Sequence, residues 1–263
     1  MSRFPVTPNR DLGQHFLVDE NILRVIGRLA GLQPGDSVLD IGPGLGVLTE
    51  YLADRVGHVR AVELDRALES PLRERFAQRE NVELQFGDAL RLDLSAGEPA
   101  PTKLVANLPY NIATPIVVES LDGLPTVAVW CVMVQREVAD RFFAEPSTKA
   151  YGAVSVLVQL AAERTGFHPV SRNVFRPRPN VDSALVAFRR RGTGIRADYA
   201  GIKRVVEAAF AHRRKTLPNS LELAGLASRE VGAAALEGIG VARETRAEAL
   251  APERFVELAR ALA

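Results

Sequence analysis

The chain has 263 residues, 47% of them hydrophobic, and a formal net charge of only +1 at pH 7. This length predicts one large α/β domain with a small appendage, and the near-neutral charge counts against a generic, strongly basic nucleic-acid binder. The longest apolar run, residues 127–134, is far too short to cross a bilayer, and the N-terminus lacks the apolar core of a signal peptide. We therefore expect a cytoplasmic protein without a membrane partner. The single cysteine, Cys131, lies in that run and is predicted to pack in the core.

Short, apolar, β-branched runs alternate with segments whose apolar residues have helical spacing. Strands are predicted at 37–41, 59–64, 82–86, 103–107 and 127–134, helices at 46–56 and 65–77, and two further strands near 165–170 and 182–190. This alternation is typical of a parallel sheet covered by helices. The predicted fold class is α/β: a Rossmann-like domain with a mostly parallel seven-stranded sheet and helices on both faces.

The composition changes near residue 192. Gly192 and Gly194 mark a turn, and Asp198 stands where an N-cap would begin a helix with apolar positions from Ile202 to Phe210. We predict a large α/β domain at 1–192 and a small helical domain at 193–263.

A glycine-rich turn follows the first long strand. Gly42, Gly44 and Gly46 lie between that strand and a predicted helix, where glycine lets the backbone approach a ligand closely. The dinucleotide fingerprint needs a further glycine at position 47, which is Val47. A pyrophosphate loop is therefore disfavoured, and Gly42 and Gly44 are candidates for another cofactor.

Two acids follow the next two strands. Glu63 can accept hydrogen bonds from both hydroxyls of a ribose, and Asp88 can accept one from an adenine amino group. Each signal is weak alone, because an acid after a strand is often a cap or solvated. Together they lie at the carboxyl ends of successive strands, where open α/β sheets bind ligands. A nucleoside without a pyrophosphate fits this pattern, and S-adenosylmethionine (SAM) is the predicted cofactor.

The fourth strand ends in Asn107-Leu108-Pro109-Tyr110. An exocyclic adenine amine is a poor nucleophile because its lone pair is delocalised into the ring. The Asn107 side-chain oxygen and the Pro109 carbonyl can accept its two N–H groups, and Tyr110 can stack on the flipped base. The alternative is a strand cap with a packed tyrosine.

Several motifs resemble the bacterial small-subunit ribosomal RNA adenine dimethyltransferases, the KsgA family, over nearly the whole chain. They are GQHFLVD (13–19), LDIGPGLGVLT (39–49), VELD (62–65), GDAL (87–90), NLPYNIATPI (107–116), VFRPRPNVDSALV (174–186) and RRKTLPNSL (213–221). The resemblance implies that SAM is contacted by His15, Leu17, Gly42, Glu63, Asp88 and Asn107. It also implies that Asn107, Pro109 and Tyr110 hold the target adenine while Phe175 closes over its other face. The alternative for Phe175 is a core aromatic.

The resemblance further implies that residues 1–192 form a SAM-dependent methyltransferase catalytic domain and that the helical domain at 193–263 recognises rRNA or the ribosome. It also implies the reaction. The family methylates N6 of two adjacent adenosines in a hairpin loop near the 3′ end of small-subunit rRNA, giving N6,N6-dimethyladenosine. The implied partner is small-subunit rRNA within an immature 30S particle, with a role in small-subunit biogenesis, and we expect a monomer. His15 replaces the usual Asn, which puts that side-chain contact in doubt. Pro218 replaces a common Arg.

Positive charge gathers in two segments. Residues 164–191 carry seven arginines against the single acid Asp182, and a second group follows at 213–215. Such faces either meet a polyanion or are merely solvated. The predicted RNA-binding residues are Arg176, Arg178, Arg213, Arg214 and Lys215. The sequence has no metal-ligand cluster, and no metal is expected.

Four other functions compete with this interpretation. A large-subunit rRNA methyltransferase of the macrolide-resistance type shares the cofactor and NLPY motifs, but residues 213–221 resemble the small-subunit enzymes. A mitochondrial transcription-factor relative is disfavoured by the absence of an Arg/Ser-rich transit segment. A non-enzymatic ribosome-assembly factor would not need the Asn107-Pro109-Tyr110 set. A small-molecule methyltransferase would not need the basic segments.

Overall fold

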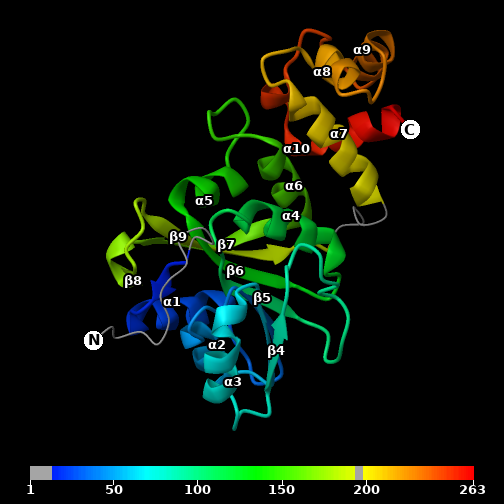
Figure 1. Ribbon diagram of the computed structural model, residues 1–263. Helices are drawn as coiled ribbons and strands as arrows, with labels where there is room; N and C mark the ends of the chain where they lie inside the picture. Colours follow the sequence, from blue (N-terminus) through cyan, green and yellow to red (C-terminus); the bar gives the residue numbers. More distant parts are fainter. Residues whose placement is uncertain (1–13, 193–197) are drawn as a thin grey trace. The chain divides into compact units, whose positions relative to one another are not determined.

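The computed structural model describes residues 14–192 and 198–263 (Figure 1). The described residues divide into two compact units. The first holds the described residues up to Ala139 together with Arg164–Arg190, and the second holds Asp140–Glu163 with the described residues from Arg191 to Ala263. Residues 193–197 lie outside the described part of the chain. The predicted domain boundary at 192/193 borders on them, and Gly194 is one of them.

The first unit is built on a twisted central sheet with the strand order β4-β3-β2-β5-β6-β9-β7 (Figure 1). The strands are β2 (Ser37–Ile41), β3 (His58–Glu63), β4 (Val82–Phe86), β5 (Lys103–Asn107), β6 (Val129–Gln135), β7 (Ala162–Val170) and β9 (Ser183–Arg190). Strands β2 to β6 pair in parallel, whereas β9 runs antiparallel to β6. A separate two-stranded sheet joins β1 (Phe16–Leu17) to β8 (Phe175–Arg176).

Helices cover both faces of this sheet and so bury its central strands on both sides. The helices are α1 (Glu20–Ala30), α2 (Val47–Ala53), the short 3-10 turn η1 (Arg66–Leu68), α3 (Glu69–Arg75), α4 (Ala113–Gly123) and the beginning of α5 (Arg136–Phe142). Successive strand residues point to opposite faces. Cys131 packs in the core cluster that contains residues of α1 and α2, whereas the neighbouring Trp130 donates its indole N–H to Ser120 of α4 at 2.8 Å. The two faces of β6 therefore have different helical covers.

The fold class predicted from the sequence is confirmed, with small differences at element ends. The strands at 37–41, 82–86 and 103–107 have the predicted bounds, and the fifth strand begins at Val129 instead of 127. The helix predicted across 65–77 is divided into η1 and α3, because the Asp65 side chain accepts the Ala67 N–H and begins a separate turn. Cys131 is fully buried, and burial raises the pKa of its thiol to about 12.

The second unit is mainly helical, and it also holds the end of α5 and the first two residues of β7. Its other helices are α6 (Ala153–Ala161), α7 (Tyr199–Ala211), α8 (Leu217–Leu223), α9 (Arg229–Gly238), the 3-10 turn η4 (Ala247–Ala249) and α10 (Pro252–Ala261). An aromatic core is formed by Tyr151, Phe210 and Phe255. The ring centroid of Phe210 lies 5.9 Å from that of Tyr151 and 5.8 Å from that of Phe255. Asp198 precedes α7 as predicted, but its side chain makes no capping hydrogen bond. No helix in the described part of the chain is long and apolar enough to cross a membrane.

Candidate active site

A pocket lies at the carboxyl ends of β2, β3, β4 and β5, within the first unit. Because parallel strands end at the same edge of a sheet, residues far apart in sequence meet there. The pocket is lined by all seven residues predicted to bind the cofactor: His15, Leu17, Gly42, Gly44, Glu63, Asp88 and Asn107. Pro109 and Tyr110 line it too. Whether these residues bind SAM and adenine stays a prediction, but the structure gathers them in one cavity.

The glycine turn needs glycine because of its backbone conformation and its contacts within the protein, apart from any ligand. Gly42, Gly44 and Gly46 have φ values of 74°, 58° and 80°, in the left-handed region that other residues rarely adopt. A Cβ on Gly42 would stand 2.9 Å from Cδ of Pro109, and one on Gly44 would stand 2.8 Å from the Phe16 ring. The glycine turn therefore packs directly against the NLPY turn. This contact brings the predicted cofactor site beside the predicted target site.

Glu63 organises the pocket through both of its oxygens. Oε2 accepts the Gly44 N–H at 3.1 Å, and Oε1 accepts the Asp65 N–H at 2.9 Å. Burial raises the pKa of the Glu63 carboxyl, and these backbone hydrogen bonds oppose that rise. Each carboxylate oxygen keeps a further lone pair, so hydroxyl donors can still bind.

Asp88 is bound more loosely than Glu63. Its carboxylate accepts the Leu90 N–H at 3.0 Å and lies 3.3 Å from the guanidinium of Arg91, while 37% of its side chain is exposed. The Arg91 partner is a surface ion pair of small energy. The carboxylate can therefore exchange this partner for an amino group that enters the pocket.

The side chain of Asn107 is oriented by one hydrogen bond. Its Nδ2 donates to the backbone carbonyl of His15 at 3.2 Å. With the amide nitrogen held in this way, the oxygen Oδ1 is left as the group that can accept from a ligand. The predicted acceptor at the tip of β5 is consistent with this geometry.

His15 contributes more than its backbone. Its Nδ1 lies 2.8 Å from the carbonyl oxygen of Pro177, and its ring centroid lies 5.5 Å from that of Tyr110. The imidazole therefore donates to the loop that follows β8 and flanks the tyrosine. The sequence left this side-chain role open, and the structure gives the imidazole partners from two separate motifs.

The NLPY turn is held on the neighbouring strand. The Leu108 N–H donates to the Met133 carbonyl of β6 at 3.1 Å, and the Pro109 carbonyl accepts the Ile112 N–H at 3.1 Å, which leads into α4. The Pro109 oxygen thus already accepts one hydrogen bond, and its second lone pair remains for an amine of the target base. The Leu108 carbonyl, in the same pocket lining, is the alternative.

Sequence reasoning missed Asp40, a pocket residue within β2. Its side chain has no exposed surface; Oδ2 accepts the Thr49 hydroxyl at 2.7 Å, while Oδ1 has no hydrogen-bond partner among the described residues. Burial, opposed by the Thr49 hydrogen bond and assisted by the charge of Glu63, raises the pKa of Asp40 to about 7. The sequence does contain a signal for this site, because Asp40 is an acid inside an apolar strand directly before the glycine turn.

The role predicted for Phe175 needs correction. Phe175 pairs with Leu17 in the two-stranded sheet, and its side chain has no exposed surface. It packs in the cluster that contains Leu185 and Val170 and is absent from the pocket lining. Phe175 is therefore a core aromatic in this structure, and it presents no face to a base.

The predicted RNA-binding cations differ in their attachments. Arg176 donates to the carbonyls of Asn173 and Phe175, and Arg213 pairs with Glu248 at 3.1 Å. Arg213 also donates to the carbonyls of Thr148 and Lys149 within the second unit. By contrast, the exposed side chains of Arg178, Arg214 and Lys215 have no ion pair or hydrogen bond to other described residues.

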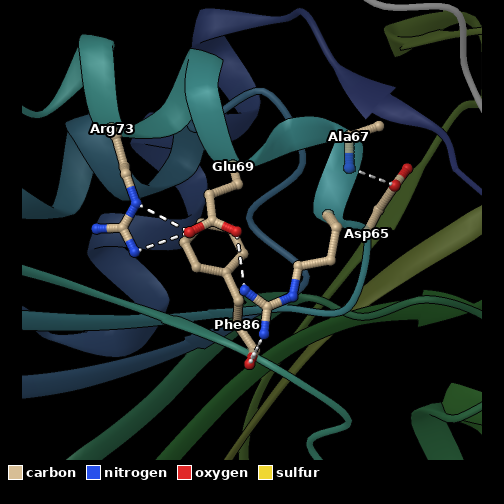
Figure 2. A network of polar contacts seen from close by, with 6 residues as sticks. Asp65, Ala67, Glu69, Arg73 and Phe86 are labelled. Atoms are coloured by element: carbon tan, nitrogen blue, oxygen red, sulfur yellow. Dashed lines mark hydrogen bonds and ion pairs between the residues drawn. The ribbon is translucent and has the colours of Figure 1, made fainter.

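The Glu69 carboxylate, at the first residue of α3, is paired with two arginines. Figure 2 shows the Arg73 guanidinium facing the Glu69 carboxylate, to which it donates at 3.0 and 2.9 Å. Arg66 donates to the same carboxylate at 2.8 Å. Both guanidinium groups lie over the Phe86 ring, 5.6 and 5.3 Å from its centroid. These hydrogen bonds, first the one from Arg66 and then those from Arg73, lower the pKa of Glu69. The network covers the last residue of β4, directly before the Gly87-Asp88 edge of the pocket.

This combination of sheet, glycine turn, strand-end acid and NLPY turn defines an α/β methyltransferase. A family model described as "Ribosomal RNA adenine dimethylase" matches residues 6–263. The chain belongs to the ribosomal RNA adenine dimethylase family, and it is an enzyme of the methyltransferase class, as the sequence predicted.

Similar proteins agree with this assignment. The chain is 47% identical to "Ribosomal RNA small subunit methyltransferase A" of Rubrobacter xylanophilus, over 96% of this chain and 94% of that protein. It is 44% identical to the protein of the same name from Moorella thermoacetica, over 98% and 93%.

Solved structures show the same fold. A dimethyladenosine transferase from Plasmodium falciparum is 24% identical with a TM-score of 0.76, covering 93% of this chain and 96% of that one. The 23S rRNA methyltransferase ErmE is 31% identical with a TM-score of 0.65, covering 94% and 99%. Among the described residues, no group of His, Cys, Asp and Glu side chains could hold a metal ion.

Proposed function

We propose that this chain transfers methyl groups from SAM to N6 of two adjacent adenosines in a hairpin loop near the 3′ end of small-subunit rRNA. One observation carries the proposal: Gly42 of the glycine turn packs against Pro109 of the NLPY turn, within a single pocket. The relatives at 47% and 44% identity are named small-subunit methyltransferases, which favours the small subunit over the large one.

The pocket suits a cationic nucleoside cofactor. Two buried carboxyls with raised pKa values, Asp40 and Glu63, line it, and Asp40 has an oxygen without a partner among the described residues. A sulfonium and an ammonium group would favour the ionised forms of such carboxyls. Glu63 would hold the ribose hydroxyls, and Asp88 the adenine amino group. The backbone of Gly42, Gly44, His15 and Leu17 would enclose the remainder. SAM supplies the electrophilic methyl group.

At the target site the chain orients an amine. Asn107 Oδ1 and a backbone carbonyl of Leu108 or Pro109 would accept the two N–H groups of the adenine N6. Their geometry would aim the nitrogen lone pair toward the cofactor side of the pocket. Tyr110 would support the flipped base by stacking. This is catalysis by positioning and preorganised dipoles.

The basic segments would bind phosphates of the rRNA. Arg178, Arg214 and Lys215 are the strongest candidates, because their exposed side chains have no partner among the described residues. Arg176 and Arg213 would contribute less, since each is already bonded to its own chain. The natural substrate would be an immature 30S particle in the cytoplasm, met by a monomer of this enzyme.

A reconstituted reaction tests the proposal. Small ribosomal subunits that lack the modification, large subunits and naked 16S rRNA are each incubated with isotopically labelled SAM, and the digested rRNA is analysed by mass spectrometry. We expect dimethyladenosine at two adjacent positions in the small subunit alone. Label in 23S rRNA would instead favour the large-subunit class. No label, together with subunit binding, would favour an assembly factor.

A further inference from the structure

Tyr110 is anchored by a residue that belongs to another motif. Its hydroxyl lies 2.7 Å from Oγ of Ser183, and one hydroxyl donates to the other. Ser183 is the first residue of β9, and only 1% of it is exposed. A buried serine on a strand is a fixed point, whereas Tyr110 lies in a turn. The hydrogen bond therefore constrains the tyrosine more than the serine.

The topology explains why this contact forms. Strands β5, β6 and β9 are neighbours in the sheet, in that order. The NLPY turn leaves β5, is fixed on β6 by the Leu108 N–H to the Met133 carbonyl, and reaches β9 through the Tyr110 hydroxyl. Ser183 lies opposite Gln135, two residues beyond Met133 in the β6–β9 register. The turn thus crosses the end of β6, with one anchor on β6 itself and a second on β9.

The ring of Tyr110 is restrained at a second point. The imidazole of His15 flanks it at a centroid distance of 5.5 Å and an interplanar angle of 33°, and His15 is itself held by the Pro177 carbonyl. With the hydroxyl and one side of the ring fixed, rotation of the aromatic plane is limited. Tyr110 lines the pocket in this orientation.

Ser183 also connects the Tyr110 ring to the arginine-containing loop 172–180, here called the basic loop. Asp182, immediately before it, accepts the Arg172 N–H at 3.0 Å through Oδ1 and the Arg136 N–H at 3.0 Å through its carbonyl. Arg172 in turn donates to the Asn180 carbonyl and closes the loop 172–180. The start of β9 is thereby fixed between the basic loop and the first residue of α5.

We propose that Ser183 is a positioning residue for methyl transfer: it sets the plane of the Tyr110 ring so that the ring is preorganised to stack on the target adenine. This inference rests on the proposed function, and it adds a residue that does not line the pocket. Burial raises the pKa of the Tyr110 hydroxyl, with the Ser183 hydrogen bond opposing and the Asp182 charge assisting, so the phenol stays protonated at neutral pH.

The test compares Ser183→Ala, Ser183→Thr and Tyr110→Phe in single-turnover methylation of unmodified small subunits. Loss of one neutral hydrogen bond should slow the Ser183→Ala enzyme by about three- to tenfold. Dissociation constants for SAM and for the subunit should stay within about twofold of wild type. Ser183→Thr keeps a hydroxyl and should recover most of the rate. Tyr110→Phe keeps the ring, loses the same hydrogen bond, and should match Ser183→Ala.

A double variant and a matched control complete the design. Ser183→Ala combined with Tyr110→Phe should be no slower than either single variant, because both remove one interaction. Ser120→Ala is the control: Ser120 is buried in the same unit, accepts the Trp130 N–H, and does not line the pocket. It should lower the melting temperature and leave the single-turnover rate unchanged.

Three results would overturn the inference. The first is a wild-type rate for Ser183→Ala. The second is additive losses in the double variant, which would mean that the tyrosine hydroxyl acts on the substrate directly. The third is an equal slowing by Ser120→Ala, which would reduce the effect to general instability. Failure of the proposed function is a separate outcome, since it would appear as wild-type enzyme that gives no dimethyladenosine.

Discussion

The pocket and the basic segment 213–215 carry the two halves of the proposed function, and they are constrained in different ways. In the pocket, parallel strand ends bring residues from 15 to 110 together, so each has a defined neighbour. In the basic segment, three consecutive cations share a sequence context but not a role: Arg213 pairs with Glu248, whereas Arg214 and Lys215 have no side-chain partner among the described residues. Strand order therefore predicts the role of each residue in the pocket, whereas a run of charge predicts only which segment contacts rRNA.

The largest expected effect concerns Asp40, the most deeply buried acid of the pocket. Its folded-state pKa is about 7 against an ordinary value of 3.8, so between these values the folded state holds a proton that the unfolded state has lost. Stability should fall as pH rises through this window, by up to about 4 kcal/mol. Asp40→Asn should remove this dependence. Urea unfolding of both proteins from about pH 4 to pH 8 measures it.

The amide that replaces the Asp40 carboxyl also changes the free energy of unfolding by an amount that does not depend on pH. This amount cancels, because the comparison uses only how the free energy of unfolding changes with pH. Thr49→Val is a useful companion, since it removes the one hydrogen bond to Oδ2. It should raise the pKa of Asp40 further and move the window to higher pH. Parallel pH profiles for wild type and Asp40→Asn would show that Asp40 is ionised in the folded state.

Asn107→Ala should have the next largest effect. Loss of one preorganised polar acceptor costs about 3 kcal/mol of transition-state stabilisation, or roughly a hundredfold in rate. The Asn107 amide also holds the His15 carbonyl at 3.2 Å, so the free energy of unfolding should fall slightly. Single-turnover methylation of small subunits with saturating SAM gives the rate. A wild-type rate would mean that Asn107 is only a strand cap.

Glu63→Gln should weaken SAM binding by about 1.5–3 kcal/mol, because charge-assisted hydrogen bonds to the ribose become neutral ones. The amide oxygen can accept only one of the two N–H groups, from Gly44 or from Asp65, and the amide NH2 then faces the other, so part of the loss comes from the support of the glycine turn. Calorimetric titration with SAM measures the change. Asp88→Asn should have a smaller effect, since the carboxylate of Asp88 is already partly exposed to water. Equal affinities for wild type and Glu63→Gln would leave Glu63 as a support of the turn alone.

The sequence predicts well where a residue's neighbours follow from strand order. Glu63 and Asn107 each end a strand with a clear apolar pattern, and the parallel order brings both to the pocket. Phe175 shows the limit of this reasoning: its motif suggests a stacking ring, but pairing with Leu17 buries it. That pairing joins segments about 160 residues apart and has no local signature in either. The role of Ser183 is hidden for the same reason.

The smallest expected effect distinguishes the cations of the basic segment. Arg214→Ala with Lys215→Ala should lower rRNA or subunit affinity and reduce the log–log salt slope by roughly 0.7–0.9 for each lost phosphate contact. The melting temperature should stay unchanged, because neither side chain is bonded to other described residues. Arg213→Ala should show the reverse pattern. Its pair with Glu248 and its bonds to the carbonyls of Thr148 and Lys149 are lost, but its side chain is 43% exposed, so the cost should be only about 0.5–1 kcal/mol.

Filter binding across a salt series and thermal unfolding of the same preparations separate the two roles. SAM affinity serves as the internal control, because neither variant alters the pocket. An unaltered slope for the Arg214/Lys215 variant would remove this segment from the rRNA contact surface. The contact would then have to come from Arg178 and the loop 172–180. An equal loss of slope for Arg213→Ala would mean that Arg213 leaves Glu248 when rRNA binds. In that case Glu248, 3.1 Å from the Arg213 guanidinium, competes with an rRNA phosphate for it. The charge of Glu248 would then limit the rRNA affinity of the segment 213–215.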